Sequence, residues 1–288
     1  SVTNLRMLPD WLLSRPSKLA INFHDGPLPR YAGLNAPVWA LINGESEYGI
    51  TWHEMAAGAD KGPILVNRQF QIASDETVFG LNAQCYQAGL AAFTELVEQL
   101  EGGRLGPQQQ DFSLRTYFGL SKRPPAAATL DWQQPAATLE KIVRALDFGR
   151  YPNPVILPKA DLGAELLLAR MAELVPAEGH GAPGTIQAFC AKTLTVRCAD
   201  GAIKLLRLTD LRGEAVDVGA TLAGLGLSVG AVLPGLPSHA EALSESVAKF
   251  CKFEEFWARR LRRMEPVELP FASRSHASGA IWQKVAAA

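Results

Sequence analysis

The sequence predicts an α/β layer structure that a linker joins to a small β-barrel. Within residues 1–103, strand-like apolar runs alternate with helical patterns, as in layered α/β folds. Residues 104–130 hold a Gln run, a Pro pair and an Ala run, a composition typical of a linker. Short strands separated by turns recur within residues 131–238, which favours a small barrel. Residues 239–288 form a separate tail.

The first domain is expected to contain three strands and three helices. The strands are predicted at 19–24, 48–55 and 64–72, and the helices at 8–15, 37–43 and 77–102. Gly44 is expected to end the second helix. In the long third helix, Asp75 and Glu76 are placed in the first turn, where they favour the helix dipole. Its apolar residues follow the helical period: Val78, Leu81, Cys85, Ala88, Ala92, Leu96 and Leu100.

The second domain begins with a short helix and continues with strands. The helix is predicted at 135–146 and the strands at 165–174, 185–189, 193–198 and 203–211. In the tail an apolar stripe predicts one more helix, formed by Phe250, Phe253, Trp257, Leu261 and Met264.

Composition narrows the function classes. The 288 residues are 48% hydrophobic with a net charge of −1, which excludes intrinsic disorder and argues against binding to nucleic acid through phosphate contacts. No apolar run reaches the ~20 residues of a membrane helix. The four cysteines lack metal-ligand spacing, so we expect no metal site, and their isolation predicts a reducing, cytoplasmic location.

Three polar residues form the candidate site. Asn22 and His24 are two residues apart at the carboxyl end of a predicted strand, so they share a face. Asp60 lies in the loop after the next predicted strand. An Asn donor, a His proton relay and an Asp that orients the His suit acyl transfer by direct attack of an amine. On spacing alone, a structural hydrogen-bonding pair stays open. His53 is interpreted as a structural histidine and Asp25 as a loop cap.

Longer motifs carry a resemblance to a known family. The runs NFHDGPLPRYAG at 22–33, PVWALINGE at 37–45, GITWHEM at 49–55 and ADKGPIL at 59–65 resemble the folate-dependent formyltransferases. Members of that family act on methionyl-tRNA, on nucleotide-linked amino sugars and on aminoacyl groups of peptide synthetases. The segments GTI at 184–186 and VRCADG at 196–201 resemble the carboxyl-terminal domain of the same enzymes.

The resemblance implies a fold, a co-substrate and roles for residues. It implies the carboxyl-terminal half of a Rossmann-like formyltransferase domain followed by an OB-like barrel. Asn22, His24 and Asp60 match the family's catalytic residues, and the implied formyl donor is 10-formyltetrahydrofolate. Leu34 stands where the sugar-modifying relatives carry Arg. The pterin is expected to lie against backbone at Arg6, Met7, Leu8, Ala56, Ala57, Gly58 and Ala59.

Two further features concern the context of the chain. Because only about 20 residues precede Asn22, we expect the amino-terminal strands of the family's sheet to be missing, which would leave apolar edges for a partner. Residues 253–261 and 264–271 resemble a linker of nonribosomal peptide synthetases. The expected partners are therefore other synthetase domains and an acceptor amine on a carrier-bound aminoacyl thioester, with neither a membrane nor nucleic acid.

Other functions stay open at this point. A domain that kept the motif without activity would serve for docking or structure in a synthetase. The same trio would also suit hydrolysis of a formyl group, or its transfer to a thiol carrier.

Overall fold

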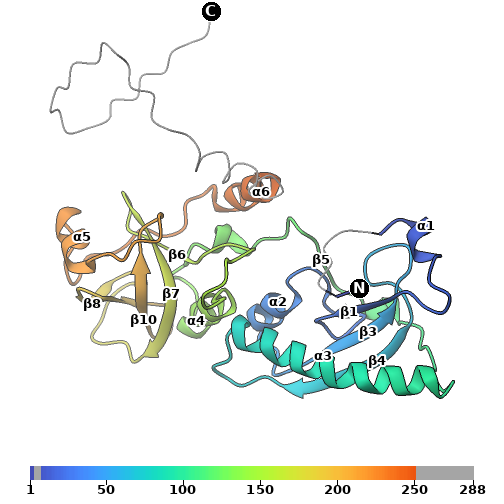
Figure 1. The fold of residues 1–288 in the computed structure, drawn as a ribbon. Helices are drawn as coiled ribbons and strands as arrows, with labels where there is room; N and C mark the ends of the chain where they lie inside the picture. Colours follow the sequence, from blue (N-terminus) through green and yellow to red (C-terminus); the bar gives the residue numbers. More distant parts are fainter. Residues whose placement is uncertain (3–7, 251–288) are drawn as a thin grey trace, which may run out of the picture. The chain divides into compact units, whose positions relative to one another are not determined.

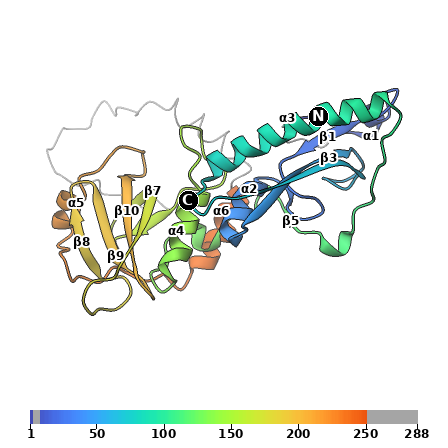
Figure 2. The same ribbon diagram turned by 90° about the horizontal axis from the view of Figure 1, so that it is seen from below.

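The first half of the chain is built on a three-stranded antiparallel sheet. In this computed structural model, which describes residues 1–2 and 8–250, the strand order is β1-β3-β4. The strands are β1 (Ile21–His24), β3 (Glu47–Glu54) and β4 (Ile64–Gln71), and the long helix α3 (Val78–Glu101) packs along β3 and β4 (Figures 1 and 2). Shorter helices are α1 (Asp10–Leu13) and α2 (Ala36–Asn43). The predicted strands and helices of this half are confirmed to within a few residues.

Local chemistry explains where the helices begin and end. Gly44 ends α2 in the left-handed conformation, with φ of 74°, as its position predicts. The Thr77 hydroxyl caps α3 by accepting a hydrogen bond from the Gly80 N–H at 3.2 Å. The prediction that Asp75 and Glu76 lie in the first turn is therefore wrong, because both precede this cap.

The buried face of α3 differs from the predicted stripe at two positions. Ala88 and Leu100 are only half-buried, and Gly89 is buried beside Ala88. Phe23 of β1 packs so closely there that a Cβ on Gly89 would lie 2.4 Å from its ring. Glycine thus lets the sheet approach the helix, at some cost in helix propensity.

The three strands are antiparallel, whereas the expected family sheet is largely parallel. Ser1 lies next to β1: its terminal ammonium donates to the Ile21 carbonyl, and the Phe23 N–H donates to the Ser1 carbonyl. The Rossmann-like half therefore stays a prediction, and the coarser α/β description holds.

A segment of residues 108–118, here named the strap, lies against the first sheet. Gln108 forms a bridge to Ile64, and β5 (Tyr117–Phe118) pairs in parallel with β2 (Ala32–Gly33). A Gln run in a linker is expected to be solvated, and this expectation is wrong for Gln110, which is 8% exposed. The short 3₁₀ helices η1 (Phe112–Leu114) and η2 (Pro125–Ala128) lie within and after the strap.

The second half contains a five-stranded antiparallel sheet of order β6-β7-β10-β9-β8. The strands are β6 (Lys159–Asp161), β7 (Leu166–Val175), β8 (Ile186–Cys190), β9 (Thr193–Arg197) and β10 (Ala202–Thr209). Four of them match the predicted runs, and β6 is too short for a period to reveal. Helix α4 (Ala136–Ala145) packs on β7 and on α2, while α5 (Val218–Gly224) packs on β8. The OB-like closure stays a prediction.

The last described element is α6 (Ala240–Phe250), which packs against η2. The tail stripe beyond Phe250 and the synthetase-like linker lie outside the described residues. None of the helices in the described part is long and apolar enough to cross a membrane.

Candidate active site

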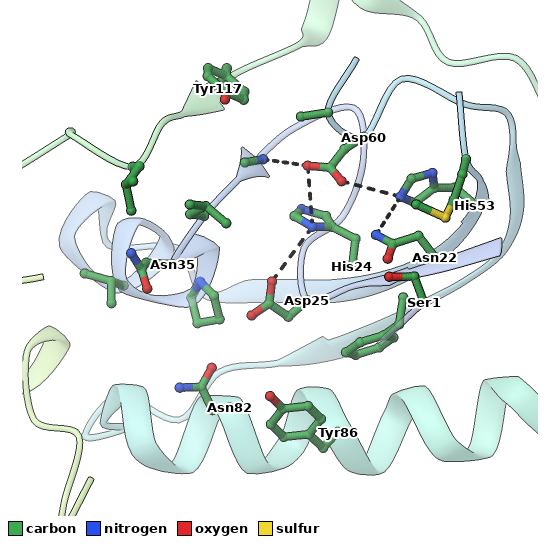
Figure 3. A pocket seen from close by; sticks show the side chains of 18 of the residues that line it. Ser1, Asn22, His24, Asp25, Asn35, His53, Asp60, Asn82, Tyr86 and Tyr117 are labelled. Atoms are coloured by element: carbon green, nitrogen blue, oxygen red, sulfur yellow. Dashed lines mark hydrogen bonds and ion pairs between the residues drawn. The ribbon is translucent and has the colours of Figure 1, made fainter. Parts of the chain in front are cut away.

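The three predicted site residues converge in one place (Figure 3). Asn22 and His24 stand at the end of β1, and Asp60 comes from the loop between β3 and β4. His24 Nδ1 lies 3.8 Å from Asp60 Oδ2. All three line a cavity of about 870 Å³. This volume lies within the usual range for small-molecule sites, roughly 300–1,000 Å³.

His24 is held in one tautomer. It is 5% exposed, and its Nε2 lies 2.8 Å from the Tyr31 carbonyl oxygen. Since a carbonyl only accepts, Nε2 carries the hydrogen and donates. Nδ1 is therefore the ring nitrogen that faces the carboxylates and exchanges a proton.

Asp60 is held in place by its own backbone conformation and by a hydrogen bond from a second segment. Its own φ is 51°, a left-handed conformation that is uncommon outside glycine. The Gly33 N–H donates to Oδ2 at 2.8 Å. Burial alone would raise the pKa of Asp60, but the neighbouring His53 ring, the charge of His24 and the Gly33 N–H together lower the pKa to about 2. Asp60 is thus ionised at neutral pH.

His53 is a site residue that sequence reasoning missed. The register of β1 and β3 places it directly opposite Asn22. Its Nδ1 donates to the Glu54 carbonyl at 2.6 Å, so its Nε2 accepts from Asn22 Nδ2 at 3.3 Å. The same Nε2 lies 3.5 Å from Asp60 Oδ1. His53 thereby fixes one N–H of the Asn22 amide and leaves the other for a ligand.

Asp25 was also misassigned, because it faces the cavity instead of capping the loop. Its Oδ1 lies 3.9 Å from His24 Nδ1, and a third of its side chain is open to the cavity. Burial raises the pKa of Asp25, the charge of His24 and a backbone hydrogen bond lower it, and the charge of Asp60 raises it, with a net rise. Side chains alternate between the two faces of a strand, but this rule does not apply to Asp25 because β1 ends at His24.

The strap holds the loop that carries Asp60. The Gln110 amide donates to the carbonyls of Asp60 and Gly62, at 2.9 and 2.7 Å. The Arg115 guanidinium donates to the carbonyls of Asp60 and Ala59, at 3.1 and 2.8 Å. These four hydrogen bonds satisfy a left-handed loop, whose carbonyls have no ladder partners.

The residues expected to bind the pterin are in part at the cavity. Its lining includes Leu8, Ala56, Gly58 and Ala59, as well as Leu34, but not Ala57. Arg6 and Met7 lie outside the described residues. Within residues 1–2 and 8–250, no group of three or more His, Cys, Asp or Glu side chains could hold a metal ion.

The arrangement supplies the parts of a proton-transfer and oxyanion site. Asn22 offers a fixed N–H donor, and His24 offers a nitrogen that takes or gives a proton. Asp60, ionised and buried beside both histidines, stabilises positive charge on either ring.

Comparison with known proteins places this chain in a family. The family model for formyl transferases matches residues 2–97, and the model for the formyl transferase C-terminal domain matches residues 123–226. A methionyl-tRNA formyltransferase of Trichlorobacter lovleyi is 32% identical over 79% of this chain and 69% of its own length. A methionyl-tRNA formyltransferase of Pelobacter propionicus is 33% identical over 80% of this chain and 69% of its own.

Solved structures share the fold at lower identity. HypX from Aquifex aeolicus in complex with tetrahydrofolic acid matches with a TM-score of 0.56 and 21% identity, over 73% of this chain and 36% of HypX. An N-formyltransferase from Helicobacter canadensis, in complex with folinic acid and dTDP-3-aminofucose, matches with a TM-score of 0.52 and 17% identity, over 66% of each chain. The chain thus spans little more than a third of HypX. Both domain models and the two curated relatives agree, and the chain belongs to the formyltransferase family of enzymes.

Proposed function

We propose that this chain transfers a formyl group from 10-formyltetrahydrofolate to a primary amine, and that the amine belongs to an aminoacyl thioester on a carrier protein. The observation that carries the proposal is the convergence of Asn22, His24 and Asp60 on one cavity. The sequence predicts these residues as the catalytic set, and they come from the end of β1 and from the loop between β3 and β4.

The cavity suits a folate. Its volume of about 870 Å³ is large enough for the pterin and the reacting nitrogen. Small residues at Ala56, Gly58 and Ala59 leave backbone accessible along one side, where a flat ring can approach and hydrogen-bond. Relatives solved with tetrahydrofolic acid and folinic acid support the same donor.

The mechanism follows from the groups around the cavity. The bound folate supplies the formyl group. The free N–H of Asn22 donates to the formyl oxygen as negative charge builds on it, and protonated His24 stabilises the same charge. Asp60, ionised because its pKa is about 2, holds the positive charge on His24 and keeps the ring in place. No covalent enzyme intermediate is required.

The acceptor is the finer part of the proposal. Curated relatives are named for methionyl-tRNA, whose acceptor group is also an amine. A net charge of −1 gives this chain little general attraction for the phosphates of a tRNA. Residues 253–271 resemble a synthetase linker, which favours a carrier-bound acceptor and other synthetase domains as partners. A cytoplasmic location belongs to the same proposal.

The test is the variant His24→Ala. We expect its rate of amine formylation to fall by at least about 100-fold, the usual contribution of a general acid–base group. Affinity for a stable folate analogue, measured by calorimetry, should stay within about threefold, because His24 acts on the formyl group and not on the pterin.

Three results would contradict the proposal. Turnover like that of the wild type in His24→Ala would exclude the assigned role. The absence of binding heat with the wild type at high analogue concentration would favour a docking domain. Release of formate from 10-formyltetrahydrofolate without any amine would indicate a hydrolase.

A further inference from the structure

A second side of the cavity carries aromatic side chains that the proposed chemistry does not use. Phe79 comes from the first turn of α3, and Phe148 and Tyr151 come from the loop after α4. The rings of Phe79 and Tyr151 stack, with centroids 5.9 Å apart and an interplanar angle of 28°. These three residues are named the aromatic wall. They do not belong to the segments expected to hold the pterin.

The aromatic wall is a fixed part of the fold. The Phe79 N–H donates to the Asp147 carbonyl at 3.2 Å, and the Arg144 guanidinium donates to the Glu76 carbonyl at 2.6 Å. These bonds join the start of α3 to the end of α4 and to the segment that follows it. Even so, Phe79 is 47% exposed and Tyr151 is 67% exposed. Aromatic rings that are held in place yet open to a cavity are typical of a surface that binds an apolar ligand.

Asp25 lies on the side of His24 that faces α3, the helix that carries Phe79. Figure 3 shows its carboxylate between His24 and the face of α3 that carries Asn82 and Tyr86. A third of the Asp25 side chain is open to the cavity, and among the described residues His24 is the side chain that forms an ion pair with its carboxylate. An exposed carboxylate beside the reacting centre is suited to receive the N–H groups of an amine.

The geometry points to an acceptor subsite in which Asp25 receives the primary amine and the aromatic wall packs against an apolar or aromatic side chain next to that amine. The inference rests on the proposed function, because it names which amines the transfer accepts. The class of acceptor is an aminoacyl group with an apolar side chain.

Charge at the site further defines the acceptor. Asp25 and Asp60 both point into the cavity, so an anionic group close to the amine would meet two carboxylates. A free amino acid carries such a group, whereas a thioester of the same amino acid does not. An acidic side chain is disfavoured for the same reason.

The transfer balances with these groups. An amine that enters as an ammonium ion gives one proton to the Asp25 carboxylate and becomes the nucleophile. Its nitrogen bonds to the formyl carbon as the bond from that carbon to the folate nitrogen breaks. The new amide nitrogen loses a second proton while the departing folate nitrogen gains one, and the proton on Asp25 returns to water.

The experiment compares acceptors on the full chain with 10-formyltetrahydrofolate. The acceptors are phenylalanyl, alanyl and aspartyl thioesters of pantetheine, and free phenylalanine. We expect kcat/KM for the phenylalanyl thioester to exceed that for the alanyl thioester about tenfold, because a pocket that packs a larger apolar group discriminates on this scale. It should exceed the values for the aspartyl thioester and for free phenylalanine by about 100-fold.

Two variants locate the subsite. Phe79→Ala should lower kcat/KM for the phenylalanyl thioester about tenfold and leave the alanyl value within about twofold. Phe93→Ala, the same truncation on α3 outside the cavity lining, should change neither. Asp25→Asn should lower kcat/KM at least about tenfold for the phenylalanyl and alanyl thioesters, with the affinity for a folate analogue unchanged.

The outcomes separate this inference from the proposed function. Equal formylation of phenylalanyl and aspartyl thioesters, with Phe79→Ala unaltered, would overturn the subsite and leave the formyltransferase standing. Folate binding without formylation of any amine would overturn both.

Discussion

At the scale of single residues, the pairing of Asn22 with His53 is the most informative feature of the site. The Asn22 amide lends one N–H to His53 Nε2, which is available as an acceptor because the Glu54 carbonyl holds the hydrogen on Nδ1. His53 touches none of the reacting atoms in the proposed mechanism. It acts as a positioning residue for the Asn22 donor, whose orientation decides how well it stabilises charge on the formyl oxygen.

The variant His53→Ala tests this role. Because the Asn22 amide then loses its anchor, we expect kcat to fall at least about tenfold with little change in KM for the folate, measured by steady-state kinetics. His180→Ala removes an exposed histidine outside the cavity and serves as the control. An unchanged kcat in His53→Ala would show that Asn22 is oriented without it.

The carboxylate of Asp60 predicts a dependence of stability on pH. Its pKa is lowered from 3.8 to about 2 in the folded protein, so its contribution is complete above the unfolded pKa and is lost as the pH falls through the folded pKa. The full contribution is about 2 kcal/mol. Between pH 5 and pH 3 the wild type should therefore lose about 1 kcal/mol more free energy of unfolding than Asp60→Asn.

Urea denaturation of both proteins at the two pH values measures this difference. Equal losses in wild type and variant would mean that Asp60 has an ordinary pKa in the fold, and that the contacts with His53 and Gly33 do not stabilise its charge.

At the scale of elements, the strap is what keeps the Asp60 loop in its left-handed conformation. Arg115 contributes two of the four hydrogen bonds to that loop, and Gln110 the others. Gly33, whose N–H donates to Asp60, is held by β2–β5 pairing, where a Cβ would lie 2.2 Å from the Phe118 carbonyl oxygen. The strap thus sets the position of a residue some 50 positions earlier in the chain.

Arg115→Ala tests the strap. Leaving two loop carbonyls without their donor should lower the free energy of unfolding by about 1–3 kcal/mol. Because the loop also carries Ala59, both kcat and the affinity for a folate analogue should fall, each about tenfold. Arg212→Ala, which removes an exposed arginine near the end of β10, is the matched control. Full activity in Arg115→Ala would assign the strap a purely structural role.

The elements show how far sequence reasoning reaches. Strong patterns predicted β3, β4, α3 and four strands of the second sheet within a few residues, because each exceeds the length at which a period becomes visible. The two-residue strands β2 and β5 and the three-residue β6 have no period to read.

For the site, too, local patterns could be predicted and contacts between distant segments could not. Asn22 and His24 were predicted because they are two residues apart at the end of a strand, and the family motifs identify both of them and Asp60. His53 was missed because its role depends on the register between β1 and β3, which local sequence does not determine. Gln110 and Arg115 were missed because they reach the site from a segment whose composition is typical of a linker.

At the scale of the whole molecule, helix α4 joins two hydrophobic cores. Leu139 and Val143 belong to the core of the second sheet, while Ala145 and Leu146 belong to the core of the first. Ile142 packs against both. Because one helix contributes to both cores, we expect the two halves of the described structure to unfold together.

Leu139→Ala tests this coupling. Leu139 is 1% exposed, so its truncation should lower the free energy of unfolding by about 2–5 kcal/mol, whereas Leu211→Ala, 64% exposed, should change it by less than about 0.5 kcal/mol. Denaturation followed by far-UV circular dichroism and by tryptophan fluorescence should give coincident transitions. Two separated transitions would show that the halves are independent.

The central claim is that the site formed by Asn22, His24 and Asp60 moves a formyl group from a folate to an amine. Its most direct test is mass spectrometry of phenylalanyl-pantetheine after incubation of the full chain with 10-formyltetrahydrofolate labelled with ¹³C in the formyl group. We predict that the label appears on the amine with the wild type, and that His24→Ala reduces it at least about 100-fold. Label that stays on the folate or leaves as formate with the wild type would contradict the claim.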